Sequence, residues 1–219
     1  MVYSDLGMML LDDVIEKVSY SNLDKLSNRY FLKPLGMSKT SFNPLDKDIA
    51  VPTEYDDYFR MRLIKGEVHD ENAFILGGVS GHAGLFSNAT DIGNFAKFFL
   101  NEGIYLGRRY LKKNLIKEFT TKIKNPVKSD RALGWDTPSI KGSSAGDYFS
   151  NMSYGHLGFT GTSLWVDPEK EIIIVFLTNR VHPSRNKKGI YKVRRELHNS
   201  ICLLYTSPSP RDRTRSRMP

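Results

Sequence analysis

The stretch that decides the fold is residues 155–163, GHLGFTGTS, which runs directly into LWVDPEKEIIIVFLTNR, residues 164–180. Its apolar residues form two runs, SLWVD and EIIIVFLTN, and the turn-forming residues DPEK lie between them. Two such runs on either side of a turn predict an antiparallel hairpin. One histidine and three glycines stand where the hairpin begins, although a buried strand should carry packing side chains there.

His156 and Gly158 suggest a reason for this composition. A histidine at the start of a strand can present its imidazole to a cleft, and Gly158 has no side chain to cover the backbone N–H groups that follow. Open N–H groups beside a base are the components of an oxyanion hole, which binds developing negative charge. The alternative is a histidine whose hydrogen bonds are satisfied at the end of a strand.

Helical periodicity dominates the residues before this hairpin. Apolar residues recur three and four positions apart, with polar residues on the opposite face. We place the cap of the third helix at Thr90 or Asp91 and its end at Gly103. The stretch ALGW at Ala132 has a strand-like period, and residues 38–82 are irregular. Helices first and antiparallel strands last predict an α+β domain; the helical segments are 5–18, 23–31, 91–101, 112–119 and 189–201.

The composition is that of an ordinary globular protein. The chain has 219 residues, of which 40% are apolar and 26% charged, and this length suits one domain or a small pair. No apolar run approaches the roughly 18 residues that a membrane span requires. The formal charge of +8 invites a nucleic-acid partner. We expect none, because the body lacks interleaved aromatic and basic residues.

Residues 202–219, CLLYTSPSPRDRTRSRMP, differ from the rest of the chain. They are rich in Ser, Pro and Arg, and they show no helical or strand period. We therefore divide the chain into a domain of residues 1–201 and a disordered tail, which resembles translated sequencing adapter; a basic RNA-binding arm is the alternative. The single cysteine, Cys202, lies in this tail, so residues 1–201 contain no disulfide and no thiolate metal site.

Tyr3, Ser4 and Asp5 lie at the start of the first predicted helix. The positive end of the helix dipole favours anions there, and it can lower the pKa of a phenol. The simpler interpretation is that Ser4 or Asp5 caps the helix and that Tyr3 packs beneath it.

Residues 77–87, GGVSGHAGLFS, nearly match the G-x-S-x-G nucleophile elbow around Ser80. His82 occupies the position of the last glycine, and no strand-like sequence precedes the serine. We therefore expect glycines that let the backbone pass close to another element, and a structural, hydrogen-bonded His82.

Several of these segments together carry a resemblance. Tyr3-Ser4-Asp5, FLKPLGMSKTSF, HDENAFILGGVSGHAGLFSNATDIGNFAKFFL and GHLGFTGTSLWVDPEKEIIIVFLTNR occur in this order. They resemble the serine hydrolases of the class C β-lactamase and penicillin-binding-protein-like superfamily over residues 1–201. The resemblance implies a β-lactamase/transpeptidase-like fold, an antiparallel sheet flanked by helices with a helical subdomain. Some similar proteins follow a glycoside hydrolase domain in a longer chain.

The resemblance also implies roles for individual residues. In this superfamily an S-x-x-K motif supplies the nucleophile and its base, a Tyr-x-Asn motif supplies a proton-shuttling tyrosine, and Lys-Thr-Gly or His-x-Gly lines the acyl site. Tyr3 matches the tyrosine, Asp5 takes the place of the asparagine, and His156 with Gly158 matches the third motif. Phe159 is then expected to offer its backbone N–H to the oxyanion hole. No metal or organic cofactor is implied.

Two departures from the family pattern shape the prediction. Asp5 places a carboxylate beside Tyr3, which should raise the pKa of the phenol and disfavour the carboxylate of a β-lactam. The S-x-x-K motif should lie upstream of Tyr3, and the one match in the chain, Ser184-Arg-Asn-Lys187, lies in a polar segment and is taken as chance. We therefore expect a C-terminal fragment, incomplete at its N-terminus, that is inactive alone and poorly soluble.

The implied activity of the complete protein is acyl transfer through a serine ester. Its substrates are expected to be small esters, amides or peptidoglycan-type peptides, and complete relatives act in the periplasm or elsewhere outside the cytoplasm. The alternative is a binding module that keeps the fold and lacks the serine.

Overall fold

A three-stranded antiparallel sheet forms the centre of the molecule. The computed structural model describes residues 3–124 and 129–206. The sheet contains β7 (Tyr154–Leu157), β8 (Ser163–Asp167) and β9 (Ile172–Phe176) in that order. The hairpin predicted from the sequence is β8 and β9, which pair from Ser163↔Phe176 to Asp167↔Ile172. β7 pairs with the other side of β8 and places His156 opposite Leu164.

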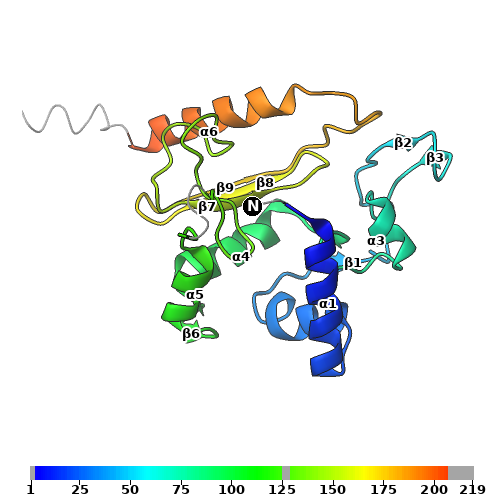
Figure 1. The fold of residues 1–219 in the computed structure, drawn as a ribbon, viewed down its shortest axis with the longest axis horizontal. Helices are drawn as coiled ribbons and strands as arrows, with labels where there is room; N and C mark the ends of the chain where they lie inside the picture. Colours follow the sequence, from blue (N-terminus) through cyan, green and yellow to red (C-terminus); the bar gives the residue numbers. More distant parts are fainter. Residues whose placement is uncertain (1–2, 125–128, 207–219) are drawn as a thin grey trace, which may run out of the picture.

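Two helices cover the two faces of this sheet (Figure 1). Successive side chains of a strand point to opposite faces, so Val166 and Trp165 contact different layers. On one face α4 (Ala89–Leu100) packs in a cluster of Ala96, Trp135, Tyr154 and Val166. On the other face α6 (Ile190–Thr206) contributes to a cluster of Ala145, Phe149, Trp165, Ile174 and Cys202.

The end of α6 corrects the predicted domain boundary. The helix continues to Thr206, and Cys202 is fully buried. Cys202 belongs to a stripe at four-residue spacing that faces the sheet, which also contains Ile190, Arg194 and His198, all buried. The prediction of a disordered tail beginning at 202 is therefore wrong for residues 202–206. Residues 207–219 of that predicted tail lie outside the described residues.

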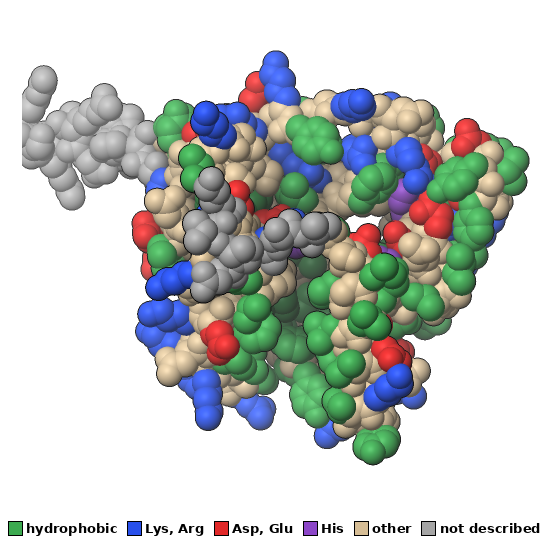
Figure 2. Space-filling view, viewed as in Figure 1, with side chains coloured by type: hydrophobic (Ala, Val, Ile, Leu, Met, Phe, Trp, Pro, Cys, Tyr) green, Lys and Arg blue, Asp and Glu red, His purple; other side chains and the backbone are tan. Residues whose placement is uncertain are grey.

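Helices α1 (Asp5–Ser19), α2 (Leu23–Ser27) and the following π-helical turn η1 (Asn28–Leu32) agree with the first two predicted helices. Leu32 packs with Leu35, Met37, Phe98 and Ile116 in a further core cluster that includes α5 (Lys113–Thr120). No residue of α1 is buried. Apolar side chains gather on the surface over α1 (Figure 2), among them Leu6, Leu10 and Val18.

Two further predictions differ from the structure. Helix α4 begins at Ala89 and is capped by Asn88, whose side chain accepts a hydrogen bond from the Asp91 N–H. The Asp91 carboxylate accepts hydrogen bonds from the Lys39 N–H and the Thr40 hydroxyl instead of capping the helix.

The ALGW stretch is a turn, not a strand. The Ala132 N–H donates to the Trp135 carbonyl, and Gly134 has φ +80°. Only Asp136, just after it, pairs with Gly155 of β7 through an isolated bridge.

The stretch 38–82 is largely irregular, as predicted, and contains only short elements. They are β1 (Ser41–Phe42), which pairs with β4 (Leu85–Phe86), β2 (Tyr55–Asp56), which pairs with β3 (Arg62–Leu63), and α3 (Glu71–Ile75). A last small hairpin joins β5 (Ile104–Tyr105) and β6 (Arg108–Arg109). Among the described helices, none has the length and apolarity needed to cross a bilayer.

Candidate active site

The fold brings together Tyr3 and His156, which are far apart in the sequence. Tyr3 directly precedes α1, His156 lies near the end of β7, and their ring centroids are 6.4 Å apart. The guanidinium of Arg131 lies 4.9 Å from the centre of the Tyr3 ring, and the same guanidinium pairs with Asp136. Asp136 also bridges to Gly155 of β7, which connects this ion pair to the strand that carries His156.

The Tyr3 hydroxyl is harder to ionise than an ordinary phenol. Partial burial raises its pKa most, and the charge of Asp5 and a hydrogen bond to Asp5 raise it further, while Arg131 lowers it. The predicted effect of Asp5 is therefore confirmed in direction. The net shift of the Tyr3 pKa is upward, opposite to the lowering that the helix dipole can produce. The capping interpretation is wrong, because Ser4 occupies the N-cap position without a side-chain hydrogen bond and the Tyr3 side chain is 57% exposed.

The turn that follows His156 and β7 leaves some of its backbone amides without hydrogen bonds. The Gly158 N–H donates to the Thr162 carbonyl at 2.8 Å, and the Gly161 N–H donates to the Gly158 carbonyl at 3.1 Å. Within the described part of the chain, the Phe159 N–H donates no hydrogen bond. The N–H groups of Thr160 and Thr162 likewise donate none there, and Phe159 carries the amide expected in the oxyanion hole.

Close packing explains the three glycines of the opening stretch. A Cβ on Gly155 would lie 2.4 Å from both the Leu164 carbonyl oxygen and the Trp165 indole. A Cβ on Gly158 would lie 2.1 Å from the Thr162 hydroxyl, and Gly161 has φ +125°. These glycines allow β7 to pair with β8 and the turn after β7 to close. The space where their side chains would stand is filled by other atoms of the protein.

The Phe159 side chain lies among cationic and aromatic groups that the sequence did not indicate. Phe159 is 58% exposed, with the Arg180 guanidinium 4.3 Å from the centre of its ring and the His69 ring stacked at 5.7 Å. Arg180 also donates through Nε to the Phe159 carbonyl at 2.7 Å. Arg180 ends the apolar run of β9 in the sequence, which is the only signal that could have marked it.

Buried Glu54 anchors the groups behind Phe159. It accepts a 2.7 Å hydrogen bond from His69 Nε2 and a 2.8 Å hydrogen bond from Arg185 Nε, and Arg185 also pairs with Glu71 at 2.7 Å. Burial alone would raise the pKa of Glu54, but the hydrogen bonds from Arg185 and His69 lower it overall. The carboxylate therefore stays ionised and holds Arg185 and His69 in place behind Phe159.

The serine of the near-elbow is structural. Ser80 is buried, its Oγ lies 2.9 Å from His82 Nδ1, and His82 Nε2 lies 2.9 Å from Asp70. A Cβ on Gly81 would lie 2.5 Å from the Met8 carbonyl of α1. The prediction of glycines that pass close to another element, with a hydrogen-bonded His82, is confirmed. The element before Ser80 is α3, not a strand.

The Ser184-Arg-Asn-Lys187 sequence lies in a turn, not at the start of a helix. The Lys187 ammonium donates to the His182 carbonyl, not to Ser184. The expectation that this match to S-x-x-K is accidental agrees with that geometry.

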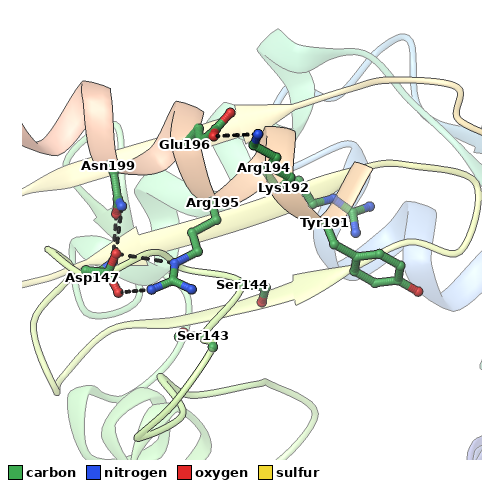
Figure 3. A pocket seen from close by; sticks show the side chains of 10 residues that line it. Ser143, Ser144, Asp147, Tyr191, Lys192, Arg194, Arg195, Glu196 and Asn199 are labelled. Carbon is green, nitrogen blue, oxygen red and sulfur yellow. Dashed lines mark hydrogen bonds and ion pairs between the residues drawn. The ribbon is translucent and has the colours of Figure 1, made fainter. Parts of the chain in front are cut away.

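A separate pocket of about 490 Å³ lies between α6 and residues 142–147 (Figure 3). Arg195 and Asn199 project from α6 to Asp147, at 2.6 and 2.8 Å. Most of its charges are paired within the protein, and none of the predicted site residues lines it. Across the described residues, no three His, Cys, Asp or Glu side chains are grouped in a way that could hold a metal ion.

Comparison with known proteins identifies the family. The profile of the family called Beta-lactamase matches residues 1–198. An N-acetylmuramyl-L-alanine amidase of Bacillus subtilis (strain 168) is 36% identical over 83% of this chain and 44% of its own length. A protein of Escherichia coli (strain K12), provisionally named a D-alanyl-D-alanine carboxypeptidase, is 36% identical over 83% of this chain and 45% of its own length.

The fold agrees with that result. The crystal structure of a β-lactamase from Mycobacterium bovis superposes with a TM-score of 0.66 at 18% identity, over 94% of this chain and 64% of the other. The chain spans slightly less than half the length of the curated relatives named above. Its α+β architecture is the β-lactamase/transpeptidase-like fold, as predicted. The chain belongs to the β-lactamase family, within the superfamily of serine hydrolases that includes penicillin-binding proteins.

Proposed function

We propose that this chain supplies the proton-transfer and oxyanion-binding half of a serine acyl-transfer site. Tyr3 moves protons, His156 lines the acyl site, and the Phe159 N–H binds the developing oxyanion. One observation carries the proposal: the ring centroids of Tyr3 and His156, 153 positions apart, lie 6.4 Å apart, and three residues after His156 the Phe159 N–H has no partner in the described residues. Asp5 and Gly158 act indirectly, on the Tyr3 pKa and on the turn that carries Phe159.

We propose a peptidoglycan-type peptide, or an ester or amide of similar shape, as the substrate. The curated relatives named as an amidase and a carboxypeptidase support this class, and they support action outside the cytoplasm. The carboxylate of Asp5 beside Tyr3 disfavours an anionic group at that point of the substrate, which argues against a β-lactam.

We further propose that these 219 residues do not turn over substrate by themselves. Covalent catalysis needs a nucleophile with an adjacent base, and the only S-x-x-K sequence lies in a turn with its lysine engaged elsewhere. A fluorophosphonate probe should therefore label no serine of the isolated chain. Labelling mapped to any serine, Ser80 included, would contradict this part of the proposal.

The direct test restores a nucleophile. The amino-terminal part of the Bacillus subtilis amidase relative, up to the position that aligns with Met1, is joined to residues 1–219. We expect the chimera to react with fluorophosphonate and to hydrolyse a p-nitrophenyl ester. Tyr3→Phe should lower kcat by about 10²–10⁴-fold, the usual contribution of a positioned acid or base.

Tyr30→Phe is the matched control, because Tyr30 is an equally exposed tyrosine in η1, outside the site. Equal rates for the Tyr3 and Tyr30 variants would remove Tyr3 from the mechanism. A chimera that folds by circular dichroism but is never acylated would favour the rival function, a binding module with the β-lactamase fold.

A further inference from the structure

Arg194 is the one charged residue in the buried stripe of α6. It is 3% exposed and lies between Ile190 and His198 on the helix face that covers the sheet. In the part of the chain that the structure describes, no carboxylate pairs with Arg194. Burying an unpaired cation costs free energy, so its position requires a compensating interaction.

Arg194 donates hydrogen bonds to the turn that carries the Phe159 amide. Its Nη2 donates to the Thr162 carbonyl at 2.6 Å and to the Gly158 carbonyl at 3.1 Å. Hydrogen bonds from a charged donor are stronger than those between neutral groups. One guanidinium nitrogen therefore holds both ends of the turn from the α6 side of the sheet.

The Gly158 carbonyl and the Phe159 N–H belong to the same peptide group. In a planar trans peptide the C=O and N–H bonds point in opposite directions. Because the Gly158 oxygen is held by Arg194 on the α6 face, the Phe159 N–H points away from α6. Along β7, His156 alternates with Gly155 and Leu157, so its side chain lies on the opposite face of the sheet from theirs, which is the face away from α6. His156 meets Tyr3 on this face.

A hydrogen bond to a peptide oxygen also polarises the N–H of the same group, which makes it a stronger donor. Arg180 holds the next two peptide groups of the turn from the loop after β9. Its Nε donates to the Phe159 carbonyl at 2.7 Å, and its backbone N–H donates to the Thr160 carbonyl at 2.8 Å. Burial and the nearby charge of Arg180 lower the pKa of Arg194, so the protein keeps two cations close together around this one turn.

We infer that Arg194 is a positioning residue of the active site: from the reverse face of the sheet it fixes and polarises the Gly158–Phe159 peptide as the oxyanion donor. The effect of Arg194 on catalysis rests on the proposed function. Its effect on the position of the Gly158–Phe159 peptide concerns this chain alone. Arg194 also lines the pocket of Figure 3, between α6 and residues 142–147.

The first test uses the 219-residue chain and needs no catalysis. Carbonyl ¹³C shifts of Gly158 and Thr162, with the amide ¹⁵N shift of Phe159, are recorded for the wild type and for Arg194→Met. We expect both carbonyl resonances to move upfield as their hydrogen bonds are lost, and the Phe159 amide to move with them. Carbonyls of the sheet interior, such as Trp165, should keep their shifts, which separates a local effect from general unfolding.

Arg195→Met is the matched control. Arg195 is the next residue of α6, it is exposed, and it pairs with Asp147 instead of the turn. Its variant should leave the three resonances in place. If Arg194→Met also leaves them in place, the inference is overturned. Should Arg194→Met fail to fold, the same three resonances are recorded for Arg194→Lys, because a lysine keeps the charge and can still donate to these carbonyls.

The second test measures kcat in the chimera described above. Arg194→Met should lower kcat about tenfold to a hundredfold at nearly constant KM, because a displaced oxyanion donor acts mainly in the transition state. Arg194→Lys should recover part of the loss, and Arg195→Met should match wild type. An active chimera indifferent to Arg194→Met, or a Lys variant no better than Met, overturns the inference. An inactive chimera refutes the proposed function and leaves the resonance test to decide whether Arg194 positions the Gly158–Phe159 peptide.

Discussion

At the scale of single residues, Asp5 and Tyr3 can be separated by titration. The charge of Asp5 and its hydrogen bond both raise the Tyr3 pKa, and burial raises it more. Asp5→Asn removes the charge and should bring the pKa partway back toward 10, while the contribution of burial remains. The ring carbon resonance of Tyr3 against pH measures this shift.

Asp13→Asn is the control for that titration, because Asp13 lies on the same helix and pairs with Lys17 on the surface. It should leave the Tyr3 titration unchanged. In the chimera, Asp5→Asn should move the alkaline limb of the pH–rate profile to lower pH. An unchanged Tyr3 titration in Asp5→Asn would assign the whole effect to burial.

The residues of the candidate site that belong to short sequence motifs could be proposed from the sequence. Tyr3, His156 and Phe159 were found because their neighbours match a family pattern. Arg131, Arg180, Arg194 and His69 were not found, because each reaches the site only through tertiary packing. Arg194 was least visible, since an arginine at that spacing in a basic helix is indistinguishable from a surface residue until the helix face is known.

At the scale of elements, substitution by alanine should destabilise the protein at the glycines of β7 and the turn after it, and stabilise it at the glycine of α4. In Gly155→Ala the new Cβ meets the Leu164 backbone, which cannot yield, so we expect a loss of about 1–3 kcal/mol in the free energy of unfolding. Gly158→Ala should cost less, because the Thr162 side chain can rotate away. Gly93→Ala, in α4 with open space around it, should gain about 0.5–1 kcal/mol. Urea unfolding of the three variants checks the order; a harmless Gly155→Ala contradicts it.

The elements whose apolar residues recur regularly over many positions were predicted. The turns and helix ends that depend on one local contact or one residue's conformation were not. α1 and the β8–β9 hairpin follow directly from spacing. The turn at ALGW depends on the positive φ of Gly134. The start of α4 depends on Asn88, which caps the helix while the Asp91 carboxylate bonds elsewhere. The end of α6 was placed too early because the Ser-, Pro- and Arg-rich residues that follow concealed the last member of the buried stripe, Cys202.

At the scale of the whole molecule, polar contacts join the segment around residues 52–71 to the loop after β9. Arg185 pairs with Glu54 and Glu71, and the Tyr55 N–H donates to the Pro183 carbonyl. The two segments are more than 100 positions apart in the sequence, so these contacts close a long loop of chain. The Arg185 guanidinium also lies 5.3 Å from the centre of the Tyr58 ring.

Acid should therefore loosen this junction before it affects the sheet. The pKa of Glu54 is lower in the folded chain than its ordinary value of 4.5, so its stabilisation is complete above that value and is lost as the pH falls below it. Arg185→Met should cost about 1–3 kcal/mol at neutral pH, because it leaves a buried carboxylate with one partner fewer. It should also flatten the decline of stability below pH 4.5. Arg62→Met, which breaks the exposed pair with Glu67, should cost less than about 1 kcal/mol and leave the acid decline intact. Urea unfolding across this pH range distinguishes the two variants, and an equally steep acid decline in Arg185→Met would show that Glu54 does not control the junction.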